Sequence, residues 1–123
     1  MLLLFMIFFH IIDDWVLQGN LGLMKQKSWW RAHPEYKDMY KYDYIIALIT
    51  HAFSWTFMIM IPIAYVSDWK MSVVFITAFI INMSIHAVVD DLKANRKKIN
   101  LVVDQVIHII QIVLTFCVFN CLA

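Results

Sequence analysis

Apolar residues fill four long stretches of the chain, and most of its polar residues lie between them. The stretches are residues 1–18, 44–66, 71–91 and 99–123. Each has the length of about 18–25 residues that a helix needs to cross roughly 30 Å of hydrocarbon. They are apolar on nearly every face, as helices exposed to lipid require. The pattern predicts an all-α polytopic membrane protein, a bundle of four transmembrane helices forming one domain over residues 1–123.

The composition agrees with this interpretation. Hydrophobic residues make up 63% of the chain and charged residues 15%, whereas soluble domains have about 45–50% and about 25%. Two glycines and two prolines exclude a linker-rich or disordered chain. A secretory signal would require basic residues before its apolar segment, and none precedes the first stretch. We therefore expect the first stretch to be a retained membrane helix.

The basic residues are divided unevenly between the connections. All ten Lys and Arg lie outside the four stretches, and nine of them lie in the connections 19–43 and 92–98. Only Lys70 lies in the connection between the second and third stretches. Cytoplasmic loops carry the excess of Lys and Arg in membrane proteins. We therefore expect loops 19–43 and 92–98 to be cytoplasmic and both termini to be non-cytoplasmic.

The first connection interleaves basic with aromatic residues, as in Ser28-Trp29-Trp30-Arg31. Trp and Tyr favour the headgroup layer, so we interpret this connection as an interfacial segment in contact with the lipid bilayer. A lid over a substrate is an alternative. We expect no nucleic-acid partner, because the segment is short and tethered to the membrane at both ends. His33 is interpreted as a surface residue.

Acidic and histidine residues interrupt the apolar stretches. The acids are Asp13, Asp14, Asp90, Asp91 and Asp104, and the histidines are His10, His51, His86 and His108. No Lys or Arg lies within the stretches to pair with them. An ionised carboxylate in hydrocarbon costs at least about 2.5–3.5 kcal/mol, so a counter-charge or a proton must offset it.

The spacing of these residues is regular. Three His–Asp pairs are four residues apart, namely His10–Asp14, His86–Asp90 and Asp104–His108. Residues at this spacing lie on one face of a helix. The order reverses on the fourth stretch, which also runs in the opposite direction through the membrane. We therefore expect one layer of histidines, including His51, with carboxylates on its cytoplasmic side.

Imidazole and carboxylate groups together suit zinc, manganese or iron, and helix bundles hold such ions between facing helices. Seven residues are candidate ligands: His10, Asp14, His51, His86, Asp90, Asp104 and His108. A tetrahedral ion uses four ligands, so the pattern predicts one or two divalent ions. Asp13 and Asp91 are candidate catalytic bases or partners of the ligands, and Gln18 and Gln105 are candidates for orienting them. The alternatives are a metal-free proton or ion path and solvated helix ends.

The motifs also resemble those of a family. His10-Ile-Ile-Asp-Asp14, Thr50-His51-Ala52, His86-Ala-Val-Val-Asp90 and Asp104-Gln105-Val-Ile-His108 look like an uncharacterised family of small bacterial and phage membrane proteins with repeated His-x-x-x-Asp motifs. The pattern is also similar to that of membrane-bound metal-dependent hydrolases. The resemblance implies a bacterial inner-membrane protein, with phage-encoded members. Relatives often have a second histidine near the one matching His51, where this chain has Ala47 and Trp55.

Three classes of function follow from these observations. The first is a metal-dependent hydrolase for a phosphoester or a lipid near the cytoplasmic membrane face. The second is a transporter or channel for divalent cations or protons, since intramembrane Asp and His mark such paths. The third is a phage-type effector or structural membrane protein without catalysis, which leaves the aligned pairs unexplained. A bundle of four short helices also favours a homo-oligomer.

Overall fold

The computed structural model describes residues 1–33 and 38–122, and among these residues the regular structure is helical, with no strand. Three helices are long and apolar enough to cross a membrane: α4 (Asp43–Val66), α5 (Val73–Ala94) and α6 (Leu101–Leu122). They match the second, third and fourth predicted spans to within a few residues. Residues 34–37 of the first connection and residue 123 of the fourth span lie outside the described residues.

The first predicted span differs from the other three. It consists of α1 (Leu2–Ile12), with 11 residues, followed directly by η1 (Asp13–Leu17), a π-helix of five residues. Three helices, rather than the four expected, therefore have the length and composition of a membrane span. The α-helix ends here because the Gln18 amide donates to the Asp13 carbonyl five residues earlier, at 2.9 Å. Gly19, with φ of +48°, then turns the chain.

The first connection is partly helical rather than an open loop. It contains α2 (Leu21–Met24) and α3 (Lys27–Arg31), and we call residues 19–33 the strap. Asn95, just after α5, ties the strap to the bundle. Its side-chain amide donates to the Lys25 carbonyl at 3.0 Å, and its side-chain oxygen accepts from the Lys27 amide at 2.7 Å. The strap thus packs against the end of the bundle.

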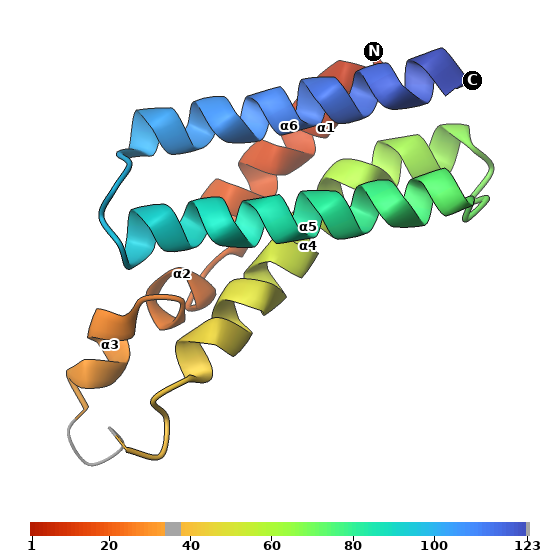
Figure 1. The fold of residues 1–123 in the computed structure, drawn as a ribbon. Helices are drawn as coiled ribbons and strands as arrows, with labels where there is room; N and C mark the ends of the chain where they lie inside the picture. Colours follow the sequence, from red (N-terminus) through yellow and green to blue (C-terminus); the bar gives the residue numbers. More distant parts are fainter. Residues whose placement is uncertain (34–37, 123) are drawn as a thin grey trace.

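The basic connections lie at one end of the bundle (Figure 1). The strap and the connection between α5 and α6 share this end, and both chain termini and the connection between α4 and α5 lie at the opposite end. This arrangement is the one that the predicted topology requires. The side of the membrane that each end faces stays a prediction.

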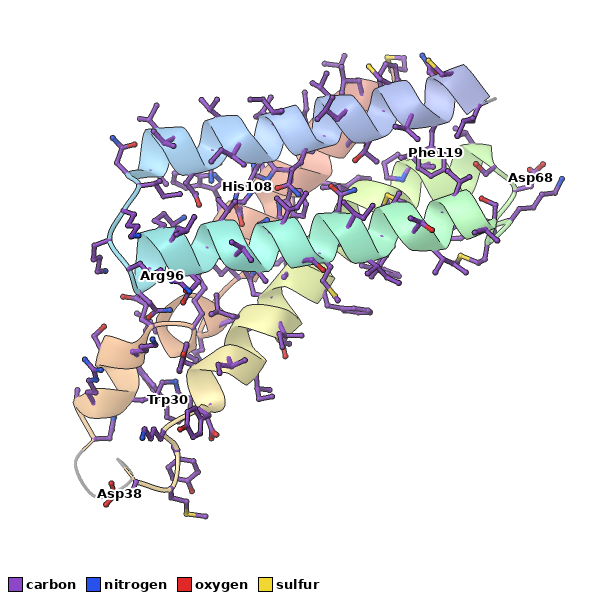
Figure 2. All side chains as sticks on the ribbon, viewed as in Figure 1. Trp30, Asp38, Asp68, Arg96, His108 and Phe119 are labelled. Atoms are coloured by element: carbon purple, nitrogen blue, oxygen red, sulfur yellow. The ribbon has the colours of Figure 1, made fainter. Side chains whose placement is uncertain are left out.

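The interior divides into an apolar part and a polar part. The buried apolar cluster contains Met6, Trp55, Ile59, Met60, Ile63, Ala64, Phe75 and Ile112. Many side chains point outward from the helices instead (Figure 2). Large apolar residues are among the exposed ones, and Phe8 on α1 and Ile80 on α5 are each 54% exposed. Buried histidines and carboxylates lie between the helices. This distribution suits a bundle surrounded by lipid.

Candidate metal centre

The three predicted His–Asp pairs face each other on their helices. The nearest nitrogen–oxygen distances are 3.8 Å for His10–Asp14, 3.8 Å for His86–Asp90 and 3.4 Å for Asp104–His108. The spacing of four residues had predicted this common face, and the structure confirms it for all three pairs. The pairs come from the first, third and fourth predicted spans, so three separate segments bring an imidazole and a carboxylate to one region.

The four histidines of the stretches form one layer. The ring centroid of His86 lies 4.1 Å from that of His108 and 5.1 Å from that of His51. The ring centroids of His10 and His108 are 5.9 Å apart. Trp55 completes the layer, because its ring stacks on His86 at 4.2 Å. The expected layer is therefore present, and α4 contributes both His51 and Trp55, one turn apart.

Asp14, His51 and His86 form one group of donor atoms that could hold a metal ion, and Asp90 lies beside it. His51 Nε2 lies 3.2 Å from Asp14 Oδ1, 3.2 Å from His86 Nε2 and 3.4 Å from Asp90 Oδ2. His86 Nε2 and Asp90 Oδ2 are 3.8 Å apart. Ligands about 2.0–2.1 Å from a zinc ion in a tetrahedron are about 3.3–3.4 Å from one another. We call these four atoms the first donor set.

A second group lies on the other side of Asp90. His108 Nε2 is 3.4 Å from Asp104 Oδ1 and 3.6 Å from Asp90 Oδ1. All three atoms are buried, and none has a hydrogen-bond partner among the described residues. Buried polar atoms nearly always have partners, so unpaired atoms that face one another call for an explanation. A cation between them supplies one, and we call these atoms the second donor set.

Asp90 connects the two sets. Its Oδ2 belongs to the first donor set and its Oδ1 to the second. Asp14 also lies near both, because it forms metal-compatible groups with His51 and His86 and with Asp104 and His108. Six of the seven predicted ligands thus lie in groups that could hold a metal ion. Shared carboxylates are the arrangement expected for two neighbouring ions.

His10, the seventh predicted ligand, lies beside these groups and belongs to none of them. Its Nδ1 accepts a hydrogen bond from Trp55 Nε1 at 2.7 Å, and its Nε2 lies 3.2 Å from Gln105 Oε1. Both ring nitrogens therefore have protein partners. Gln105 Nε2 in turn donates to Asp14 Oδ2 at 3.0 Å and to Asp104 Oδ2 at 3.1 Å. His10 and Gln105 orient the ligand carboxylates, as we had expected of Gln105.

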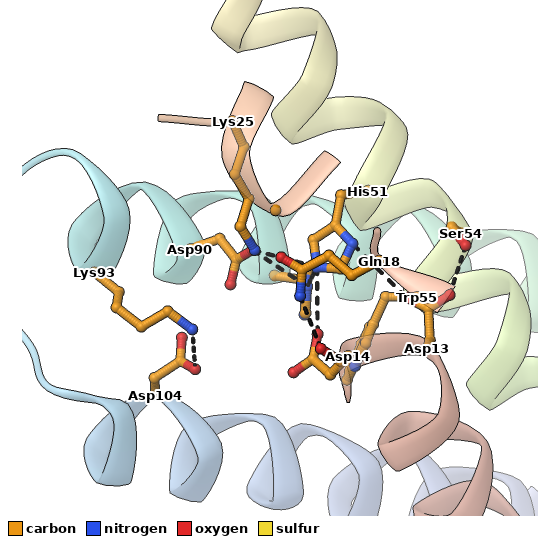
Figure 3. A network of polar contacts seen from close by, with 12 residues as sticks. Asp13, Asp14, Gln18, Lys25, His51, Ser54, Trp55, Asp90, Lys93 and Asp104 are labelled. Atoms are coloured by element: carbon orange, nitrogen blue, oxygen red, sulfur yellow. Dashed lines mark hydrogen bonds and ion pairs between the residues drawn. The ribbon is translucent and has the colours of Figure 1, made fainter. Parts of the chain in front are cut away.

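The two candidate catalytic bases have different surroundings. Asp13 is buried, and its Oδ1 accepts from Ser54 Oγ at 2.6 Å. Its Oδ2 faces His51 Nδ1 at 3.8 Å, and within residues 1–33 and 38–122 neither atom has a hydrogen-bond partner. Figure 3 shows Asp13 between Ser54 and the centre. This geometry suits a carboxylate that orients the His51 ring.

Asp91 lies apart from the donor sets. Its carboxylate accepts from Asn95 Nδ2 at 2.8 Å and from Arg96 Nε at 2.8 Å. The geometry gives Asp91 a place at the end of α5, where it supports the residue that holds the strap. Gln18, the other residue expected to orient ligands, donates to the backbone carbonyl of Asp14 at 2.8 Å.

Two lysines from outside the predicted spans reach the centre and supply part of the counter-charge that the acids were expected to need. Lys25 of the strap contacts Asp90 Oδ2, and Lys93 Nζ lies 2.6 Å from Asp104 Oδ2 (Figure 3). Two features of the fold bring them there. The strap folds back toward the bundle, and α5 continues past its predicted end at residue 91 to Ala94.

The charges of the centre do not balance. Four carboxylates (Asp13, Asp14, Asp90 and Asp104) face two ammonium groups (Lys25 and Lys93), which leaves a formal charge of −2 while the imidazoles are neutral. Uncompensated charge is costly in the interior of a membrane protein. One divalent cation would balance the charge, and a second would create a positive centre able to attract an anion.

A chain of buried polar side chains extends from the centre between α5 and α6. His108 Nδ1 lies 3.2 Å from Gln111 Oε1, Gln111 Nε2 lies 3.3 Å from Asn82 Oδ1, and Asn82 Nδ2 donates to Thr115 Oγ1 at 2.8 Å. The sequence analysis did not identify this continuity. The positions of Gln111 and Thr115, three and seven residues after His108, were the available signal.

Comparisons of the chain with protein-family models, curated proteins and solved structures give no match. The resemblance to small bacterial and phage membrane proteins therefore stays a prediction.

Proposed function

We propose that this chain is an intramembrane metal-dependent hydrolase that acts on a phosphoester or a lipid near the cytoplasmic membrane face. The observation that carries the proposal is the pair of donor sets joined by Asp90. Seven atoms of imidazole and carboxylate groups converge there, at distances that suit coordination. In a purely structural cluster, the buried polar atoms would be expected to have hydrogen-bond partners. The three atoms of the second donor set have none among the described residues.

The residues take distinct parts in this proposal. The first donor set would hold one ion, with Asp14, His51 and His86 as the group that fits it. His108, Asp104 and Asp90 would hold a second ion. Such ions activate a water molecule near neutral pH and polarise a phosphoryl oxygen. Asp13 positions His51, and His10 and Gln105 position Asp14. Of the two candidate bases, Asp13 faces a residue of the first donor set, whereas Asp91 is bound by Arg96.

The proposal includes a membrane arrangement. In it, α1 and η1 together serve as a fourth, short membrane segment beside α4, α5 and α6, and the strap and residues 95–100 face the cytoplasm. The termini then lie on the far side of a bacterial inner membrane. The outward-facing apolar side chains of α1, including Phe5 and Phe8, support contact with lipid. A homo-oligomer is compatible with these exposed surfaces.

The test is elemental analysis of protein purified in detergent without chelator. The H86A/D90A double variant removes a donor from both sets, and Ser84→Ala on the exposed side of α5 is the matched control. We expect zinc, manganese or iron at a ratio of one to two per chain in the wild type and the control, and little in the double variant. A wild type that binds no metal, even after metal is added back, would refute the proposal.

A second candidate function is a transporter or channel for divalent cations or protons. The polar chain from His108 through Gln111 and Asn82 to Thr115 favours it, because conduction requires polar groups at successive depths. Flux into proteoliposomes tests this alternative. A Thr115→Val variant should then lose flux, whereas it should leave hydrolysis by the donor sets intact, because Thr115 bonds to Asn82 and to the Gln111 carbonyl and to no donor atom. An effector without catalysis would keep its function both in the H86A/D90A variant and in the variant of the polar chain.

A further inference from the structure

Lys25 is a buried cation that the metal-binding proposal does not use. The residue is only 4% exposed, although it belongs to a connection rather than to a long helix. Its ammonium group has three N–H donors, and among the described residues its hydrogen-bond acceptor is Asp90 Oδ2 alone. A buried ammonium group with donors to spare can accept a further anionic partner.

The backbone around Lys25 is fixed from both sides. Asn95 binds the Lys25 carbonyl and the Lys27 amide through its two side-chain groups, at 3.0 Å and 2.7 Å. Asn95 itself is held by Asp91 at 2.8 Å. The lysine side chain is therefore directed into the centre by an anchored segment (Figure 3). This arrangement differs from that of a surface lysine, which would pay conformational entropy to reach the same place.

Lys93 approaches the same centre from α5. Its Nζ contacts Asp104 Oδ2 at 2.6 Å, and its side chain is 26% exposed. The acceptors of the two lysines, Asp90 and Asp104, are also the carboxylates of the second donor set. When those carboxylates bind divalent ions, less of their negative charge remains to balance the two ammonium groups. The ammonium groups then stand beside positive ions and require an anion.

We propose that Lys25, assisted by Lys93, binds the phosphate group of the ligand at the metal centre. This inference rests on the proposed metal site and narrows its ligand class to phosphate esters. A phosphate group presents several anionic oxygens, so it can contact the ions and an ammonium group at the same time. A neutral carboxylic ester or an amide would leave the two buried ammonium groups without a charged partner, which is costly.

The experiment measures binding of inorganic phosphate to the metal-loaded protein by isothermal titration calorimetry. The variants are Lys25→Met, Lys93→Met and, as a matched control at the opposite end of the bundle, Lys70→Met. Metal content is measured on each sample first. Loss of a charge-assisted hydrogen bond from a buried group weakens binding by about 10- to 100-fold. We expect this loss for Lys25→Met, a smaller loss for the more exposed Lys93 and none for Lys70→Met.

One result would overturn the proposal, namely that Lys25→Met binds phosphate as the wild type does. If this variant also binds metal more tightly, Lys25 is only a counter-ion of Asp90. A wild type that binds no metal fails at the earlier measurement and refutes the metal site, and with it this inference. If Lys25→Met does not fold, Lys25→Gln serves instead, because it keeps a polar side chain without the charge.

The source of the phosphate group is distinguished by competition. Glycerol 3-phosphate represents a soluble phosphoester, and phosphatidic acid in mixed micelles represents a lipid headgroup. Displacement of bound phosphate by either compound supports the inference and identifies the side from which the ligand comes. If neither compound displaces phosphate at concentrations well above that of the protein, the centre does not accept phosphate esters and the inference fails.

Discussion

Asp13 and Asp91 were equivalent candidates in the sequence, and the structure separates them in a way that one experiment can test. Asp13 Oδ2 faces His51 Nδ1 at 3.8 Å, and both atoms are buried without another partner in the described part of the chain. Asp91 is bound instead by Asn95 and Arg96. We therefore compare Asp13→Asn with Asp91→Asn, two substitutions of the same size and chemistry.

The magnitude follows from what the amide can offer to His51. An Asn at position 13 either turns its N–H toward Nδ1 or presents a neutral oxygen, which accepts less strongly than a carboxylate. The first choice favours the tautomer with the proton on Nε2, the atom of the first donor set. Loss of a carboxylate that orients a metal-bound histidine typically costs about 10- to 100-fold in metal affinity. This factor corresponds to about 1.4–2.7 kcal/mol.

The assay is competition with a chromophoric chelator for zinc in detergent. We expect Asp13→Asn to lower the affinity for one of the ions by this factor. The affinity for an ion in the second donor set should not change, because that set does not contain His51. Asp91→Asn should bind metal as the wild type does. Equal affinities for the wild type and Asp13→Asn, or an equal loss in both variants, would refute the assignment of Asp13 to His51.

Three further predictions use other contacts of the centre. Asp90→Ala should lower the metal content more than His51→Ala, because Asp90 has an oxygen in each donor set and His51 has an atom in one; equal contents measured by mass spectrometry would contradict this. Trp55→Phe should lower the free energy of unfolding by about 1–3 kcal/mol, since it leaves the buried Nδ1 of His10 without its donor. Titration with sodium dodecyl sulfate, followed by circular dichroism, measures that loss. Asn95→Ala should accelerate amide hydrogen exchange in the strap and not in α6, because both hydrogen bonds from the Asn95 side chain to the strap are removed.

The sequence predicted the parts of the centre that depend on helical periodicity. A spacing of four residues places two side chains on one face whatever surrounds the helix. The pairs His86–Asp90 and Asp104–His108 therefore followed directly from the sequence, and so did the shared layer that His51 joins. The lengths of α4, α5 and α6 followed from hydropathy in the same way.

The features that the sequence did not predict depend on contacts between distant segments. Nothing local distinguishes Lys25 from the other lysines of its connection, and its burial results from Asn95, which lies 70 residues away. The π-helical turn that begins at Asp13 replaces one backbone hydrogen-bond pattern with another, and the hydropathy of a stretch does not distinguish the two patterns. Trp55 was interpreted as a departure from a family pattern, whereas its indole group packs on His86 and binds His10.

The shortness of the first helical segment has a consequence for the surrounding bilayer. The 11 residues of α1 and the five of η1 span about 24 Å at 1.5 Å per residue, whereas the hydrocarbon layer is about 30 Å thick. Phe8, Ile11 and Trp15 face outward along this segment. Lipids that solvate these side chains must thin locally to relieve the hydrophobic mismatch. In the proposed membrane arrangement, the membrane surface would then dip beside Asp14. A lipid headgroup would travel a shorter distance to the carboxylates than the thickness of an undisturbed leaflet would impose.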